Sequence, residues 1–276
     1  MPGSSYHKIA VQVASWLSVV PECKINSSTR TICENLRKTS LRKGEIMISF
    51  DVSSLYTNVP VLEAILYCTD LLYALPKDKI PPVSKETFIV LAKIASCEVI
   101  MSTHDGFYKQ IDGLAMGSPP APHIANGWLS QFEDKIRGNA KIYERYMDDI
   151  LREIDEVKAE AKLMEINSLH PNLKFTSEVE QQQSQVPQSR IPFLDMCIMH
   201  DNMTGQLSST WYNKPTDTGL IMNYHALAPK RYKRSVVSGF VHRIHRACSS
   251  WHYFHESLEK AKRILEFLQS HHERDS

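Results

Sequence analysis

The sequence contains no Cys-x-x-Cys pair among its six cysteines and no apolar run long enough to span a bilayer. Singly scattered cysteines argue against a zinc site or a disulfide framework and favour reduced thiols in an intracellular protein. The apolar run near the N-terminus, Ile9 to Val20, is interrupted by polar residues and is not followed by a small-x-small cleavage site. We therefore predict an amphipathic helix there. We expect a nuclear or cytoplasmic protein without membrane association, not a secreted one.

The chain also lacks a strong net charge, an internal repeat and a long disordered linker. Its 276 residues, 42% hydrophobic and 23% charged, can bury one large core or two modest ones, so we expect a globular protein. No Ser-His-Asp or Cys-His arrangement stands out, which argues against catalysis through a side-chain nucleophile. The formal charge of +1 says little about partners until its distribution along the chain is considered.

Two adjacent carboxylates, Asp148 and Asp149, stand between apolar and aromatic residues in the segment Arg145 to Arg152. The flanking residues are typical of half-buried strands and place the pair at the tip of a hairpin. Most Asp-Asp pairs are solvated turns or helix N-termini, but a purely structural hairpin turn would more naturally carry Asn-Gly or Asp-Gly. Neighbouring aspartates repel each other, which raises a pKa unless a divalent cation compensates. The pair is therefore a candidate site for a hard ion such as Mg²⁺, which serves phosphoryl transfer.

Strand and helix patterns alternate before the C-terminal part of the chain. The apolar run from Glu45 to Asp51 predicts a buried strand with an acid at its exit. We predict helices over Val59–Tyr73, Ser84–Ser96, Ile124–Ile136 and Glu156–Leu169, a hairpin over Val99–Gln110, strands over Leu173–Val179, Ile191–Met199 and Leu207–Tyr212, and loops over Gly113–Pro122 and Gln181–Arg190. From Tyr232 onward the pattern is helical and basic. This order predicts an α+β core over residues 1–200 and a helical domain over residues 201–276.

Asp51 is the natural third acid of such a site. Two-metal phosphoryl transfer needs carboxylates from separate strands around ions about 3.5–4 Å apart. Tyr56 follows five residues after Asp51, and the turn between them can aim backbone amides at phosphates. The glycines of Gly113–Pro122 permit close approach of a flat ligand, and its prolines stiffen the entry to the next helix. Asp51 alone could be a strand-end cap and the loop an ordinary turn, so the order of all three segments is what indicates a site.

In these segments the chain resembles motifs A, B and C of reverse transcriptases, with the closest likeness to Penelope-like retroelements. The three segments are Phe50–Pro60, Asp112–Pro119 and Arg145–Asp149. His170–Glu178 and Ile191–Asp195 resemble motifs D and E of that group, and Tyr212–Thr216 and Lys233–Val237 resemble its thumb. Met116 stands where many reverse transcriptases carry Gln, although Met is usual in the Penelope-like group.

The resemblance implies a right-hand polymerase palm, an antiparallel sheet packed on helices, followed by an α-helical thumb. It implies an RNA-directed DNA polymerase that uses two Mg²⁺ ions, with Mn²⁺ as an alternative, to add dNTP to a DNA primer on an RNA template. The implied metal ligands are Asp51, Asp148, Asp149 and the carbonyl of Val52. The implied nucleotide contacts are the amides of Ser54 and Leu55 on the triphosphate, Tyr56 as a steric gate against a 2′-hydroxyl, Met116 and Gly117 against the base or nucleotide, and Lys174 as proton donor to pyrophosphate.

In the family that the chain resembles, the fingers domain would precede the position that corresponds to Gly3-Ser4, and an endonuclease module would follow the thumb. We therefore expect a fragment of a retroelement reading frame that contains the palm and thumb and lacks most of the fingers. Intact acids do not by themselves make such a fragment active.

The C-terminal segment carries the positive charge. From Pro229 to Arg263 there are nine basic and two acidic residues, a local excess of seven positive charges. Spaced basic residues are often only a solvated face, but the aromatic residues nearby favour contact with the phosphate backbone of a primer–template duplex. The expected contacts are Lys214, Lys230, Arg231, Lys233, Arg234, Arg243 and Arg246.

Two other interpretations of this segment remain open. The histidines His242, His245, His252 and His255 have helical metal-ligand spacing, but the nearby cations and the lack of acids argue against a metal site. A helix-turn-helix over Tyr232–Leu268 is the second, although phosphate contact without base recognition suits a thumb better.

The sequence leaves two functions of different classes. The first is the polymerase core, and the second is a catalytically silent fragment that binds nucleic acid only through its basic C-terminal helices. RNA-directed RNA synthesis is a weaker third hypothesis, because Tyr56 would exclude ribonucleotides.

Overall fold

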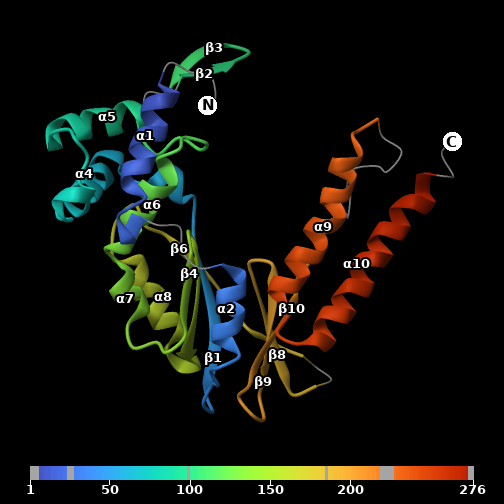
Figure 1. Ribbon diagram of the computed structural model, residues 1–276. Helices are drawn as coiled ribbons and strands as arrows, with labels where there is room; N and C mark the ends of the chain where they lie inside the picture. Colours follow the sequence, from blue (N-terminus) through green and yellow to red (C-terminus); the bar gives the residue numbers. More distant parts are fainter. Residues whose placement is uncertain are drawn as a thin grey trace. The chain divides into compact units, whose positions relative to one another are not determined.

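The computed structural model describes residues 6–23, 28–97, 100–183, 186–214, 216–217 and 227–272, and only the backbone of Met101 and of residues 267–272 (Figure 1). Helices and antiparallel sheets are both present, which confirms the predicted α+β class. None of the described helices is long and apolar enough to cross a membrane. The chain divides into two compact units, residues 1–26, 50–150 and 157–177 in the first and residues 27–49, 151–156 and 178–276 in the second.

The first unit is mainly helical. Its helices are α1 (His7–Leu17), α3 (Leu55–Asn58), α4 (Val61–Tyr73), α5 (Lys85–Cys97), α6 (Ala121–Ser130), α7 (Glu133–Arg137) and α8 (Ala159–Asn167). Helix α4 packs against α5 and α6, and α1 packs against α5. Helix α1 buries Ala10, Val13 and Leu17 at helical spacing, which confirms the amphipathic helix predicted over this segment.

Local signals set several boundaries of these elements. Helix α4 begins directly after Pro60, and Ser84 precedes α5 with its Oγ accepting a hydrogen bond from the Thr87 amide at 3.2 Å. The predicted hairpin is present as β2 (Ile100–Thr103) and β3 (Gly106–Lys109). The helix predicted over Ile124–Ile136 is instead two helices, α6 and α7, because the chain turns at Gln131 and Phe132.

A four-stranded sheet carries the candidate acids. Among the described residues its order is β4 (Tyr143–Tyr146), β5 (Asp149–Asp155), β1 (Glu45–Val52) and β6 (Phe175–Val179). The central position of β1 explains its apolar run, since a central strand can bury side chains on both faces. Met147 and Asp148 alone join β4 to β5, so the predicted hairpin is confirmed, with the carboxylate pair at its tip.

The second unit contains an antiparallel sheet with the order β10 (Leu207–Trp211), β9 (Met196–Asp201), β8 (Gln188–Phe193) and β7 (Gln181–Gln182). The single strand predicted over Ile191–Met199 is wrong, because Phe193 pairs with Met196 and the chain reverses between them. Leu194 makes this reversal possible by adopting a positive φ of 54°. The polar segment Gln181–Arg190, predicted as a loop, contributes β7 and the start of β8.

Three helices complete the second unit: α2 (Thr29–Leu36), α9 (Lys230–Ala247) and α10 (Trp251–His272). Helices α9 and α10 pack against each other and against β10, and they form the orange and red pair in Figure 1. They confirm the helical pattern predicted from Tyr232 onward. The boundary between domains at residues 200 and 201 stays a prediction.

Candidate active site

Asp51 and Asp148 lie side by side where β1 ends and the β4–β5 turn begins. The amide of Val52, the residue after Asp51, donates a hydrogen bond to the carbonyl of Asp148 at 3.3 Å. Asp51 is exposed, whereas Asp148 is half-buried and Asp149 opens β5 beside it. Burial raises the pKa of Asp148 above its usual range and the charge of Asp51 raises it further, although a backbone hydrogen bond lowers it. The pair thus concentrates negative charge in a partly desolvated place.

This donor set fits part of a divalent-cation site. No group of three or more acidic, histidine or cysteine side chains that could hold a metal occurs in the part of the chain that the structure describes. Mg²⁺ at phosphoryl-transfer sites is commonly held by one or two carboxylates, with water and substrate phosphates completing the shell. Asp51 and Asp148 can supply the two carboxylates.

Tyr56 lies beside the acid pair. Its phenol is half-buried, and its pKa is raised by burial and then by the charges of Asp148 and Tyr146. The backbone carbonyl of Tyr56, in α3, accepts a hydrogen bond from the amide of Leu114 at 2.6 Å. The tyrosine is therefore held between the carboxylates and the loop that begins at Gly113.

The loop from Gly113 packs closely against α3. Gly113 has a φ of 75°, and a Cβ atom on it would lie 2.8 Å from the carbonyl oxygen of Thr57. Farther along the loop, Met116 is 71% exposed. Gly117 has a φ of 87°, with nothing within 4 Å of a Cβ atom. The structure therefore joins the start of the loop to the Tyr56 helix and leaves Met116 and Gly117 facing open space.

Gly113→Ala is expected to destabilise the protein by roughly 2–4 kcal/mol, because backbone strain and a clash with Thr57 act together. Gly117→Ala is the matched control, since it carries the strain of a positive φ without the clash, and about 1 kcal/mol is expected. Urea unfolding of both variants measures the difference. Equal destabilisation would show that the loop does not pack on α3.

Ser54 and Lys174 also lie at this end of β1. The amide of Ser53 donates a hydrogen bond to the carbonyl of Lys174 at 2.8 Å, and the Lys174 side chain is exposed. Ser54 adopts the left-handed conformation with a φ of 51°. Only Ser54, Met147 and Leu194 among the described non-glycine residues have a positive φ. Two of these three flank the acids, and such strained residues cluster at functional sites.

Arg145 is a residue of this site to which the sequence alone assigned no role. Its guanidinium is buried and donates hydrogen bonds to Glu133 Oε2 at 3.0 Å and to Asn126 Oδ1 at 2.8 Å. It also donates to the carbonyl of Met147 at 3.2 Å, directly before Asp148. A charged residue at the inward position of a half-buried strand was the signal that could have identified it. Arg145 thus ties the strained hairpin turn to α6 and α7.

The predicted phosphate contacts are concentrated on one helix. Lys230, Arg231, Lys233, Arg234, Arg243 and Arg246 all belong to α9, and each is exposed except Lys233, which is half-buried. Lys214 is exposed in the segment after β10. Helix α9 buries Phe240, Ile244 and Ala247 on the face that packs into the core. Its basic residues are not among these buried side chains.

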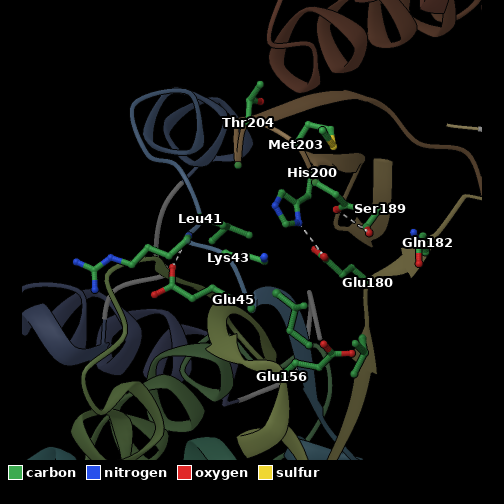
Figure 2. Close-up of a pocket in the computed structure, with 16 residues that line it drawn as sticks. Leu41, Lys43, Glu45, Glu156, Glu180, Gln182, Ser189, His200, Met203 and Thr204 are labelled. Atoms are coloured by element: carbon green, nitrogen blue, oxygen red, sulfur yellow. Dashed lines mark hydrogen bonds and ion pairs between the residues drawn. The ribbon is translucent and has the colours of Figure 1, made fainter. Parts of the chain in front are cut away.

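A hollow of about 600 Å³ in the second unit contains none of the predicted site residues (Figure 2). It is lined by His200 and Glu180, whose Nδ1 and Oε1 atoms lie 2.8 Å apart and whose side chains are 9% and 4% exposed. The second oxygen of Glu180 accepts a hydrogen bond from the amide of Met47 at 3.0 Å. Both carboxylate oxygens therefore have protein partners, which gives the pair a structural role.

Comparisons with known proteins agree with this architecture. The structure resembles telomerase from Candida albicans in complex with a TWJ fragment of telomeric RNA, at 12% identity and a TM-score of 0.61, over 96% of this chain and 46% of that one. It also resembles the RNA-dependent RNA polymerase of a human picobirnavirus, at 13% identity and a TM-score of 0.55, over 96% of this chain and 50% of that one. The chain thus spans about half the length of these proteins.

The animal helix-turn-helix domain family matches residues 220–267, which include α9 and most of α10. No curated protein matches the sequence. At these low identities the structural likenesses show the fold alone, a polymerase-like palm and an α-helical thumb, as predicted.

Proposed function

We propose that this chain is the palm and thumb of an RNA-directed DNA polymerase of a Penelope-like retroelement. The observation that carries the proposal is the pairing of Asp51 with Asp148 at the ends of adjacent strands, with Tyr56 beside them. The polymerase-like fold supports it. The reaction is transfer of a nucleotide from dNTP to a primer 3′-hydroxyl on an RNA template.

The proposed roles are those that the resemblance to reverse transcriptases implies, and the proximity of Asp51 to Asp148 supports them. Asp51 and Asp148, with Asp149 and the carbonyl of Val52 nearby, would hold Mg²⁺ or Mn²⁺. When bound, the ions lower the pKa of the primer hydroxyl and neutralise charge on the phosphates. No side-chain nucleophile is needed for this chemistry, which agrees with the absence of a recognisable one in the sequence.

The nucleotide would lie against the turn after β1. Ser54 adopts the left-handed conformation, which occurs in backbone nests that bind anions, so the amides of Ser54 and Leu55 would contact the triphosphate. Lys174 is at the same strand end and would donate a proton to the leaving pyrophosphate. Met116 and Gly117 would contact the base from the exposed part of their loop.

Primer extension tests this function. The chain is incubated with an RNA template, a DNA primer, dNTP and Mg²⁺ or Mn²⁺. Extension is expected, and it should be lost in Asp148→Asn. Absence of extension would refute the polymerase proposal.

Tyr56→Ala is expected to raise incorporation of ribonucleotides relative to deoxyribonucleotides by about tenfold or more, because removing the ring opens space for a 2′-hydroxyl. Single-nucleotide extension with matched rNTP and dNTP measures this ratio. Tyr108→Ala is the control, since Tyr108 is a 52% exposed tyrosine of β3. An unchanged ratio in Tyr56→Ala would remove Tyr56 from the role of sugar gate.

The match to the animal helix-turn-helix domain favours a second candidate function, nucleic-acid binding without catalysis. This candidate uses the cations of α9 and predicts salt-sensitive binding that Asp148→Asn leaves unchanged. Charge removal at Arg243 and Arg246 should weaken it. Lack of binding to any nucleic acid at low salt would exclude this function.

A further inference from the structure

An exposed aromatic cluster lies where α9 meets α10. Trp251, the first residue of α10, is 68% exposed although tryptophan is a costly residue to leave in water. Its ring stacks on Phe254, with centroids 4.9 Å apart and an interplanar angle of 17°. The ring of His255 meets Trp251 edge-on at 4.9 Å, and His245 of α9 meets Phe254 edge-on at 6.0 Å. The indole therefore contacts two rings of α10, and one of these, Phe254, is in turn contacted by His245 of α9.

This cluster does not fill the core of the second unit. The buried aromatic contact of these helices is made by other residues, Trp211 and Phe240, whose rings meet edge-on at 5.8 Å. Helix α10 buries Ser257 and Ala261, which follow Trp251 by six and ten residues. Because Trp251 is mostly exposed to solvent, burial of its ring contributes little to the stability of the fold.

Positive charge predominates on the N-terminal side of the cluster. From Pro229 to His255 the chain contains six cations, all on α9, and no carboxylate. Arg243 and Arg246 lie in the last two turns of that helix, next to the cluster in sequence, and both are exposed. The first acid is Glu256, whose Oε1 is 3.2 Å from His252 Nε2. An occupant with negative charge and flat apolar faces would match both properties of this surface.

We propose that Trp251, supported by Phe254, is a stacking platform for an unpaired base of a single-stranded nucleic acid whose phosphates contact the basic residues of α9. This inference rests on the nucleic-acid binding in the proposed function and adds recognition of an unpaired base to it. Every nucleobase has a flat face that can stack on an aromatic ring, so such a platform does not select sequence. A duplex hides those faces within its own stack.

The test measures binding of the full chain to fluorescent 12-nucleotide oligonucleotides by anisotropy. The ligands are single-stranded RNA, single-stranded DNA, a duplex of the same length and an abasic strand that keeps every phosphate. Trp251→Ala is expected to weaken binding of the single strands about tenfold or more, the loss of one base stack. Binding of the duplex and the abasic strand should not change. The RNA and DNA arms show which sugar the site accepts.

Two control variants make the result specific. Trp251→Phe should retain most of the affinity because it keeps an aromatic face, and Phe107→Ala should bind as the wild type does. Phe107 is 81% exposed on β3 and belongs to the first unit. Urea unfolding of each variant should give a midpoint close to that of the wild type, since none of these side chains is buried.

Three outcomes would overturn the inference. The first is unchanged single-strand binding in Trp251→Ala, and the second is an equal loss for the abasic strand or the duplex. The third is an equal loss of binding to polyglutamate, which would indicate an acidic protein partner. Primer extension separates this inference from the proposed function: extension by a Trp251→Ala chain with undiminished single-strand binding would refute the platform alone. Trp251-dependent binding by a chain that cannot extend a primer would refute the polymerase alone.

Discussion

Arg145→Ala is expected to lower the free energy of unfolding by about 3–5 kcal/mol. The guanidinium is buried and ion-paired with Glu133 at 3.0 Å, and it also donates to Asn126 and to the carbonyl of Met147. Removing it takes the closer of two cations from Glu133 and removes a buried donor from Asn126 Oδ1 and the Met147 carbonyl. Because Met147 has a positive φ of 57°, the hairpin turn that carries Asp148 loses the contact that holds its strained backbone.

Arg137→Ala is the matched control for this prediction. Arg137 also approaches Glu133, with 3.7 Å between Nη2 and Oε1, but its side chain is 49% exposed and water can replace it. A loss of about 1 kcal/mol or less is expected. Urea unfolding of both variants provides the comparison. If the two changes cost the same, Arg145 does not have the buried structural role described above.

Asp51→Asn and Asp148→Asn are each expected to reduce nucleotide addition by a factor of 100 or more, since loss even of a residue that only supports a metal ligand costs about 10–100-fold. The fold should survive both changes. In metal-free buffer Asp148→Asn is expected to be somewhat more stable than the wild type, because a neutral side chain removes the cost of burying a charge and the repulsion from Asp51.

Single-turnover extension measures the rate, and thermal unfolding in the presence of a chelator measures the stability. Asp105→Asn is the control, because Asp105 is an exposed aspartate in the β2–β3 turn. Its rate should equal that of the wild type. A variant of Asp51 or Asp148 that retains the wild-type rate would exclude the acid pair from catalysis.

Local patterns in the sequence were enough to predict most elements of the fold. The apolar run ending at Asp51 is strand β1, and the residues on either side of Asp148 form the β4–β5 hairpin. Ser84 predicted the start of α5 through its capping chemistry, and its Oγ is bonded to the Thr87 amide. These signals succeed because they depend only on near neighbours in the chain.

The failures involve residues that act against their local preference. Nothing in Phe193-Leu194-Asp195 signals a turn, because leucine rarely adopts the positive φ that Leu194 has between β8 and β9. The role of Arg145 could not be predicted from its strand, since its partners Glu133 and Asn126 are supplied by helices α7 and α6. Tertiary contacts decide both positions.

The residues of the candidate site could be predicted from the sequence, but their arrangement in space could not. Asp51 and Asp148 are distant in sequence, and their proximity depends on β5 lying next to β1 in the sheet. The spacing of residues along the chain does not predict which strands are neighbours in a sheet. The expectation that the two acids meet came from the resemblance to reverse transcriptases. The structure brings Tyr56 to the same place, whereas Met116 is 71% exposed and Gly117 has nothing within 4 Å of a Cβ atom.

Binding of Mn²⁺ to the full chain, measured by isothermal titration calorimetry, tests most directly whether the acid pair is a divalent-cation site. We predict saturable binding by the wild type and by Asp105→Asn, and no detectable binding by Asp51→Asn or Asp148→Asn. Binding of equal affinity by the wild type and Asp51→Asn would contradict the account.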